Sequence, residues 1–517
     1  MQANRDTANW ADLVLLNANV IALDAAHPRA NAVVVSGGRI AWVGDSDRLP
    51  SSVRVSANII DCGGQTLIPG FIDAHCHLLA YAASLLAVDC SSASTSEIDD
   101  ILSQIRRRAD STPRGEWIRG TGYSEFDLRE KRHPTRWELD RAAPFNPVRL
   151  NHRSGHACVL NSIALERVGI DIATEEPPGG TMARDLISAE PNGLLLDMDE
   201  WLDVRIPPMS EGELRDGMAQ ANRQFLSQGI TSIADATVSN SPDRWKLLRR
   251  LKCDGLITPS LTVMPGAANL DEFADEGLHF GYGDSVATIG HAKIILTSST
   301  SGRLHPSPDE LRHRIDLAHR HCSPVAIHAI EKEAVLAAST ALMASRIPGL
   351  RDRIEHASEC PPEAMDALLR AKPVVVSQPS FVRDSGARYL SEFGEDARWL
   401  YRFRMLAESG IVLAASSDAP VSVPSPLMSM HAAITRETDS GAELNVGESV
   451  TVAQALEMHT NKAAYAIYRE DEVGTIAPGK RADLVLLDAD PTRIASERLL
   501  DVRATMTIIG GELVWQA

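Results

Sequence analysis

The sequence of 517 residues lacks the features that would place it in a membrane or on a nucleic acid. No apolar run approaches the roughly 20 residues that a membrane-spanning helix needs. Basic residues are outnumbered, with 51 Lys and Arg against 69 Asp and Glu, which gives a net charge of −18. Phosphate backbones and anionic lipid surfaces repel so acidic a chain. We therefore expect no nucleic-acid partner and no membrane partner.

Paired cysteines are also lacking. The seven cysteines are an odd number, scattered from Cys62 to Cys360. Such a set argues against a disulfide framework and favours a reducing compartment. Residues 1–10 are polar and lack the basic-then-apolar pattern of a secretion signal. We therefore expect a cytoplasmic protein.

The hydrophobic and charged fractions, 44% and 23%, are those of a globular protein with an ample core.

Two matching segments lie near the chain ends. Residues 11–18 read Ala-Asp-Leu-Val-Leu-Leu-Asn-Ala, and residues 482–489 read Ala-Asp-Leu-Val-Leu-Leu-Asp-Ala. Both belong to regions of short β-rich runs with Gly-Gly turns. Chance similarity between strands is one explanation. We favour the other, a small composite β-sandwich domain formed by residues 1–66 and 471–517.

Between the chain ends, short apolar strands alternate with amphipathic helical patterns, which is typical of βαβ units. Eight candidate strands span residues 67–73, 230–235, 260–264, 292–297, 325–328, 353–356, 374–378 and 411–416. Helices are expected at residues 95–109, 211–227, 311–321, 331–344 and 362–371. Eight units predict an α/β fold, a (β/α)8 TIM-type barrel over residues 67–470. Residues 80–228, approximately, are too many for one loop, so we expect an inserted lobe over the barrel mouth.

The first barrel strand leads into His75 and His77. Alternate side chains of a strand share a face, so the two imidazoles point together while Cys76 points away. Neutral imidazole is the commonest metal ligand in proteins. The pair is therefore half of a possible metal site, although a single His-x-His motif is weak evidence.

Four more strands carry polar residues that suit the same site. They are Lys293, His328, His356 and Asp418. A barrel brings the C-terminal ends of its strands to one face, so these side chains are expected to converge with the first pair. Imidazole and carboxylate ligands with open positions are typical of a catalytic zinc-like ion.

Each residue also has a purely structural interpretation. A histidine that ends an apolar strand is often a hydrogen-bonded core residue, and Asp418 before Ala-Pro could cap a turn. Lys293 could point outward with its aliphatic stem under a helix. The shared site is favoured because each residue lies on a different predicted strand, which chance does not readily explain.

This arrangement resembles the amidohydrolase superfamily, and more closely amidohydrolase family 3, the YtcJ-like branch. The resemblance covers nearly the whole chain. It includes Trp117-Ile-Arg-Gly-Thr-Gly-Tyr123, the stretch from Pro147-Val through Ser154-Gly-His156 to Asn161-Ser, Gly229-Ile-Thr, Gln378-Pro, Ser417-Asp418-Ala-Pro and Gly474-Thr-Ile-Ala-Pro-Gly-Lys.

The resemblance implies two divalent metals, zinc being the expected ion. It implies that His75 and His77 hold one metal with Asp418, and that His328 and His356 hold the other. Lys293 would be carboxylated, so that its carbamate bridges both ions.

The resemblance also implies that Asp418 moves the proton from water to the leaving nitrogen. His156, from the inserted lobe, would contact the substrate carbonyl, and Gln378 is a second candidate for substrate binding. Two segments depart from the family pattern: residues 329–332 read Ala-Ile-Glu-Lys instead of Ala-Ile-Gly-Asp, and residues 297–302 lack the usual Asp-Gly pair. Neither removes a ligand, but both change the rim of the site.

The sequence therefore predicts a metal-dependent hydrolase that cuts a non-peptide C–N bond in a small N-substituted amide or related acyl compound. A single-metal deaminase or esterase is the alternative within the superfamily, and for it Lys293 would be dispensable. An inactive scaffold is the alternative outside enzymes. The exposed composite sheet also suggests a homodimer.

Overall fold

The computed structural model describes residues 11–26, 30–49, 58–177, 179–298 and 302–517. Residues 1–10, considered above for a secretion signal, lie outside the described residues, as do residues 299–301 of the segment that departs from the family pattern. Within the described part of the chain, every helix is too short or too polar to cross a membrane.

Two parallel sheets form the centre of the molecule. The first has the order β16-β15-β14-β7 and consists of β7 (Phe71–Cys76), β14 (Ile230–Asp235), β15 (Ser260–Val263) and β16 (Ala287–Ile289). The second has the order of the sequence and consists of β17 (Ala292–Ile295), β18 (Val325–Ala329), β19 (Arg353–His356), β20 (Val374–Ser377) and β21 (Leu413–Ala415). Each of the eight predicted segments overlaps one of these strands.

Backbone hydrogen bonds connect the two sheets in two places. In the segment after β15, the carbonyl of Pro265 accepts from the amide of Lys293 in β17, at 2.8 Å. At the β7 edge of the first sheet, the amide of Asp418 donates to the carbonyl of His75, at 2.9 Å, and that of His77 donates to Ala419, at 2.8 Å. These bonds hold the end of β7 beside the turn that follows β21.

Helices follow most of the parallel strands. They are α7 (Pro242–Cys253), α8 (Leu270–Asp275), α9 (Pro308–Arg320), α10 (Lys332–Ala344), α11 (Pro362–Ala371), α12 (Ser380–Phe393), α13 (Phe403–Glu408), α14 (Pro426–Thr435), α15 (Val452–Met458) and α16 (Asn461–Ala466). The predicted bounds of α11 are correct. The start of α9 was predicted three residues too late, because Ser307 caps the helix by accepting a hydrogen bond from the amide of Glu310.

Both faces of the parallel strands are apolar. In β20, Val375 belongs to a large cluster packed under the helices, whereas Val374 and Val376 belong to a separate cluster with Ala74 and Ala414. Burial on both sides explains the nearly continuous apolar runs in the sequence, because parallel strands have no solvent-facing side.

Strands from both chain ends pair in one sheet. Its order is β2-β6-β22-β23-β24, with β2 (Asn19–Val20), β6 (Thr66–Pro69), β22 (Leu484–Leu487), β23 (Ala504–Ile509) and β24 (Glu512–Gln516). A second sheet, β4-β3-β1-β5, contains β1 (Leu13–Leu16), β3 (Ala32–Ser36), β4 (Arg39–Gly44) and β5 (Asn58–Asp61). The matching segments of the sequence therefore lie in different sheets, as β1 and β22, but their side chains share one apolar cluster.

The predicted first barrel strand, residues 67–73, is wrong in its bounds, because two strands meet there. β6 belongs to the sheet of the chain ends, and β7 to the parallel sheet. The break falls at Gly70, whose amide donates to the carbonyl of Asp483, while the next amide donates to Gly229. A Cβ atom on residue 70 would lie 2.1 Å from Thr231 Oγ1, so the close approach of the two strands requires glycine.

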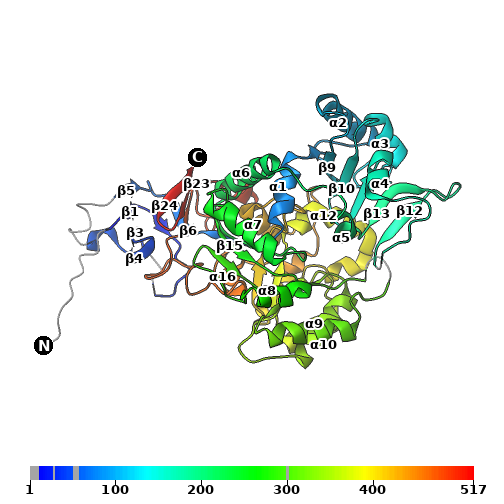
Figure 1. Cartoon of the computed structure of the whole chain (residues 1–517). Helices are drawn as coiled ribbons and strands as arrows, with labels where there is room; N and C mark the ends of the chain where they lie inside the picture. Colours follow the sequence, from blue (N-terminus) through cyan, green and yellow to red (C-terminus); the bar gives the residue numbers. More distant parts are fainter. Residues whose placement is uncertain (1–10, 27–29, 50–57, 178, 299–301) are drawn as a thin grey trace.

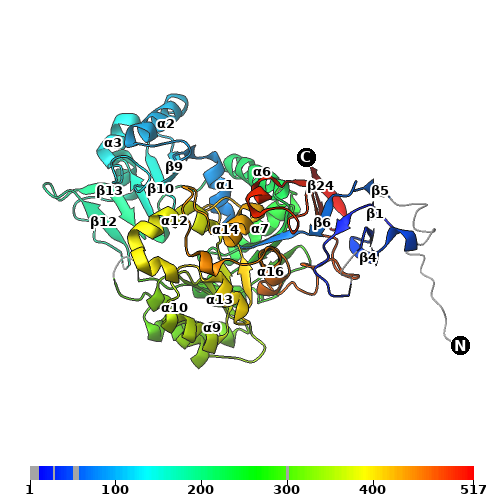
Figure 2. The same cartoon turned by 180° about the vertical axis from the view of Figure 1, so that it is seen from behind.

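A third group of elements lies between β7 and β14 in the sequence. After α1 (Leu78–Leu86), a six-stranded sheet has the order β12-β13-β11-β10-β9-β8. Its strands are β8 (Val88–Asp89), β9 (Ile118–Tyr123), β10 (Val148–His152), β11 (Ala157–Leu160), β12 (Thr181–Arg184) and β13 (Pro191–Leu196). Its helices are α2 (Ile98–Ser111), α3 (Arg136–Ala142), α4 (Ser162–Val168) and α5 (Asp199–Asp203), and α6 (Glu211–Ser227) leads back to β14. Figures 1 and 2 show β9, β10, β12 and β13 with α2 and α3 at the opposite end of the molecule from the sheets of the chain ends, whereas α1 and α6 lie between the two.

We predict that Gly70→Ala destabilises the protein by about 2 kcal/mol, because the added methyl group overpacks the contact with Thr231. Urea unfolding followed by circular dichroism measures the change. Gly212→Ala is the matched control, since a Cβ atom there meets no atom within 4 Å and the residue lies in α6. Equal stability of Gly70→Ala and the control would contradict the prediction.

Candidate metal centre

Three candidate ligands come together where β7 meets the turn after β21. His75 is the second-last residue of β7, and His77 immediately precedes α1. Asp418 adopts a left-handed backbone conformation, with φ of 57°, which turns the chain after β21 towards these histidines. The backbone hydrogen bonds between the two segments fix this arrangement.

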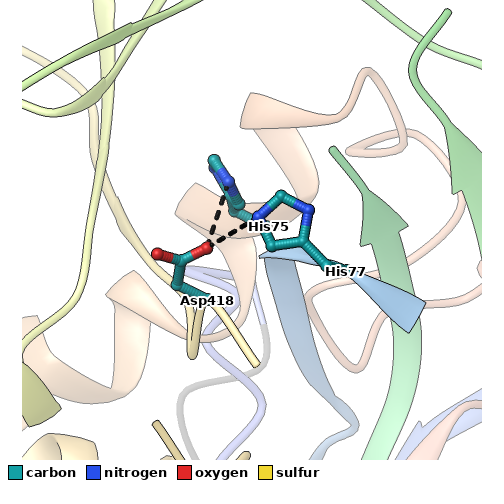
Figure 3. A group of neighbouring side chains, drawn as sticks. All are labelled: His75, His77 and Asp418. Atoms are coloured by element: carbon teal, nitrogen blue, oxygen red, sulfur yellow. Dashed lines mark ion pairs between the residues drawn. The ribbon is translucent and has the colours of Figure 1, made fainter. Parts of the chain in front are cut away.

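The side chains of these three residues face one another. Asp418 Oδ1 lies 3.1 Å from His77 Nε2 and 3.4 Å from His75 Nε2 (Figure 3). One ligand atom from each residue lies within 4.8 Å of the other two. Among the described residues, this is the one group of three or more His, Cys, Asp or Glu side chains that is so close.

A buried carboxylate determines the tautomer of His75. Glu355 Oε2 lies 2.5 Å from His75 Nδ1, and Arg353 Nη2 donates to the same oxygen at 2.7 Å. A carboxylate only accepts hydrogen bonds, so Nδ1 carries the proton and Nε2 directs its lone pair at Asp418. Since no N–H within the described part of the chain is aligned to donate to Asp418 Oδ1, two lone pairs face each other there. A divalent cation between them fits this donor set.

A second pair of histidines lies beside the first group. The ring centroids of His328 and His356 are 4.5 Å apart, and that of His75 is 5.2 Å from that of His356. His356 Nδ1 lies 2.7 Å from Gln378 Oε1, so it donates its proton to the amide. His356 Nε2 is buried and has no partner among the described residues, which leaves another lone pair for a cation.

Three of these rings are shifted towards the neutral form. Burial, together with the nearby Lys293, lowers the pKa of His75 to about 3. Burial also lowers the pKa of His328 and His356. Neutral imidazole is the form that binds metals.

Lys293 points into the site. Its side chain is buried, and its Nζ lies 3.4 Å from His75 Nε2. The interpretation in which the lysine points outward under a helix is therefore wrong. Burial lowers the pKa of Lys293 to about 8, so a larger share of the amine is neutral than in water.

His156 reaches the site from the inserted group of strands. Its ring centroid is 6.0 Å from that of His328, and its Nδ1 lies 2.9 Å from Asp197 Oδ1. Burial lowers the pKa of His156, but the hydrogen bond with Asp197 and the charges of Asp197, Asp199 and Asp418 together outweigh burial and leave the pKa raised. With 43% of its side chain exposed, it is accessible to a bound molecule.

Gln378 has a different environment from the one expected of a substrate contact. It is fully buried, its oxygen accepts from His356, and its nitrogen donates to Ser416 Oγ at 2.9 Å. Both ends of the amide are thus used inside the protein. Its geometry is that of a residue that orients His356.

Glu355 and Arg353 were missed as candidate site residues. The signal was present, because both charged residues lie on alternate positions of a short strand that is fully buried and ends in the candidate ligand His356. Two charges on the same face of a buried strand must pair with each other or with a partner in the core.

Comparisons with known proteins show the family to which the chain belongs. The model of the amidohydrolase family matches residues 58–515. The chain is 32% identical to N-substituted formamide deformylase of Arthrobacter pascens, with 98% of each chain covered. It is 28% identical to the putative amidohydrolase YtcJ of Bacillus subtilis, over 94% of this chain and 96% of the relative.

The fold has a close counterpart among solved structures. An uncharacterized metal-dependent hydrolase from Pyrococcus horikoshii superposes with a TM-score of 0.76 at 23% identity, over 94% of this chain and 99% of that chain. Its likeness shows the fold, and the sequence comparisons show the family. The chain belongs to the amidohydrolase family, and it is a metal-dependent hydrolase of carbon–nitrogen bonds other than peptide bonds.

Proposed function

We propose that the substrate is a small N-substituted amide, in particular an N-substituted formamide, which the enzyme cleaves to a carboxylic acid and an amine. The observation that carries the proposal is the group of His75, His77 and Asp418, which face one another with Lys293 beside them. The formamide class is supported by the relative from Arthrobacter pascens, which aligns with this chain from end to end.

The proposed site holds two divalent ions. His75, His77 and Asp418 would hold one, His328 and His356 the other, and Lys293 would lie between them. The unpartnered, buried lone pairs of Asp418 and His356 support this assignment. A bound divalent ion supplies Lewis acidity and lowers the pKa of a coordinated water towards neutrality.

Carboxylation of Lys293 would complete the ligand set. The neutral Nζ forms a bond to the carbon of carbon dioxide, one C–O π pair moves to oxygen, and Nζ releases a proton. The product is a carbamate anion in place of a buried cation. The lowered pKa of Lys293 supports this step, because only the neutral amine reacts.

The remaining residues have proposed roles around the reacting bond. Asp418 accepts a proton from the attacking water and passes it to the leaving nitrogen. Asp197 accepts a hydrogen bond from Nδ1 of His156 and favours the protonated ring, whose pKa is raised. In that form Nε2 also carries a proton and donates a hydrogen bond to the carbonyl oxygen as negative charge develops there. Gln378 orients His356 and does not contact the substrate.

We also propose that the parallel strands form a closed (β/α)8 barrel that brings these residues together. The hydrogen bonds that connect the two parallel sheets in two places support a closed barrel. We assign the sheets of the chain ends to a composite β-sandwich domain and the β8–β13 group to a lobe inserted after the first barrel strand. We place the boundary between the β-sandwich domain and the barrel at Gly70 rather than at residue 66.

A single-metal deaminase or esterase is the second candidate function. One observation favours it, namely that His328 and His356 lie outside the three-residue ligand group. In that case Lys293 would stay an unmodified amine.

We predict that the metal-loaded enzyme hydrolyses N-substituted formamides faster than the matching esters and cyclic imides. A panel of these compounds, assayed by liquid chromatography for released amine or acid, tests this expectation. Removal of metal with a chelator should abolish the activity, and added zinc should restore it. A preference for esters, or activity that a chelator leaves unchanged, would overturn the proposed function.

Lys293→Ala should lose most of the activity and bind about one metal per chain instead of two, because the bridging ligand is gone. A short carboxylate such as acetate should restore part of the activity and part of the metal binding. Steady-state kinetics and elemental analysis measure the effects. Full activity of the variant with one metal would favour the single-metal candidate.

Glu355→Gln should weaken metal binding by about 10- to 100-fold, since His75 loses the carboxylate that holds its proton on Nδ1. Competition with a chromogenic chelator measures the affinity. Glu359→Gln is the matched control, because Glu359 follows the same strand but bonds to the amide of Lys332. An affinity equal to that of the control would contradict the assigned role of Glu355.

A further inference from the structure

A second cluster of polar side chains lies at the strand ends of the inserted lobe. β9 and β10 are parallel neighbours, and Glu125 follows the first while His152 ends the second. The turn at residues 153–155 then reverses the chain into β11, and His156 directly precedes that strand. The cluster is therefore connected through one short turn to the histidine that faces the metal centre.

Hydrogen bonds define the protonation of His152. The amide of Ser154 donates to His152 Nδ1 at 3.1 Å, so Nδ1 carries a lone pair. The hydroxyl of Ser154, 2.8 Å from the same nitrogen, therefore also donates to it. The ring proton is then on Nε2, which lies 2.9 Å from Glu125 Oε2. Burial raises the pKa of Glu125, but His152, a backbone hydrogen bond and His133 together outweigh burial and lower the pKa to about 2, so this group is a carboxylate.

The same serine holds the backbone of His156. Its Oγ accepts a hydrogen bond from the amide of His156 at 3.2 Å. Gly155 between them has a φ of 75°, which permits the tight turn. On its other side, His156 is fixed by Asp197, whose amide donates to the carbonyl of His156 at 2.8 Å. Hydrogen bonds therefore hold the backbone both within the turn and directly after it.

These contacts matter because His156 is partly exposed. With 43% of its side chain accessible, the ring is only partly enclosed, with His328 on one side at a centroid distance of 6.0 Å. The direction of the ring therefore depends largely on its backbone and on Asp197. By contrast, the side chain of His152 is 6% exposed and packs edge-on against Tyr123, with ring centroids 5.2 Å apart, so it is a rigid support.

We propose that Glu125, His152 and Ser154, the lobe triad, are positioning residues that fix the turn at residues 153–155 and hold His156 in its catalytic orientation. The lobe triad acts through His156 and does not touch the substrate. This inference rests on the proposed function, in which His156 contacts the carbonyl oxygen. A purely structural role in the lobe would affect stability without affecting the orientation of that ring.

The kinetic test is Ser154→Ala in the metal-loaded enzyme. We expect kcat to fall by about ten-fold while KM changes by less than about two-fold, because a misplaced hydrogen-bond donor stabilises the transition state less. Bound metal and Tm should stay unchanged, and Ser154→Thr should restore kcat. Ser188→Ala is the control, since its hydroxyl bonds to Asp185 in an exposed turn of the same lobe.

A double-mutant cycle shows whether the effect passes through His156. In the His156→Gln background, Ser154→Ala and Glu125→Gln should have no further effect on kcat. If either substitution lowers kcat as much in the His156→Gln background as in the wild type, the lobe triad acts independently of His156 and the inference is wrong. Unchanged kcat in both single variants would also overturn it.

A measurement without substrate separates this inference from the proposed function. In protein labelled with ¹⁵N-histidine, the imidazole signals of His156 are those missing from His156→Gln. They should shift in Ser154→Ala and stay in place in Ser188→Ala. Should the enzyme fail to cleave formamides, such a shift would still support the positioning role. Its absence would refute that role even in an enzyme active on formamides.

Discussion

The arrangement of the candidate metal centre depends on one buried interaction, the contact of Glu355 with His75 Nδ1, which Arg353 supports from the other side. It keeps the proton of His75 on Nδ1 and leaves Nε2 with a lone pair beside Asp418, where the three candidate ligands face one another. Burying a carboxylate and a guanidinium is costly unless both are fully paired, and loss of one partner leaves an isolated charge in the core. The three residues therefore form a unit in which each side chain requires the others.

The apolar strands and their order could be predicted from the sequence, because parallel strands buried on both faces are continuous hydrophobic runs. The site residues could be predicted for the same reason, since polar side chains at the ends of such runs have few other places to go. His75, His77 and Asp418 meet within hydrogen-bonding distance, and Lys293 points at them.

Other properties depend on contacts between distant segments. The break at Gly70 is set by the carbonyls of Asp483 and Gly229, neither of which is near it in the sequence. The hydrogen bonds of Gln378 with His356 and Ser416 likewise join segments that are apart in the sequence, whereas the family resemblance alone made Gln378 a candidate for substrate binding. To predict which ring nitrogen of a histidine carries the proton, one likewise needs to know which atom that nitrogen faces.

The break at Gly70 separates two strands whose neighbours in the sheets are synthesised at different times. β6 precedes the strand that carries His75 by a single residue, and its antiparallel neighbour is β22, from the far end of the chain. The ribosome makes β6 early and β22 only after the whole parallel region has been synthesised. The pairing of β6 with β22, one residue away from the strand that carries His75, is therefore a late event that follows the synthesis of residues 484–487.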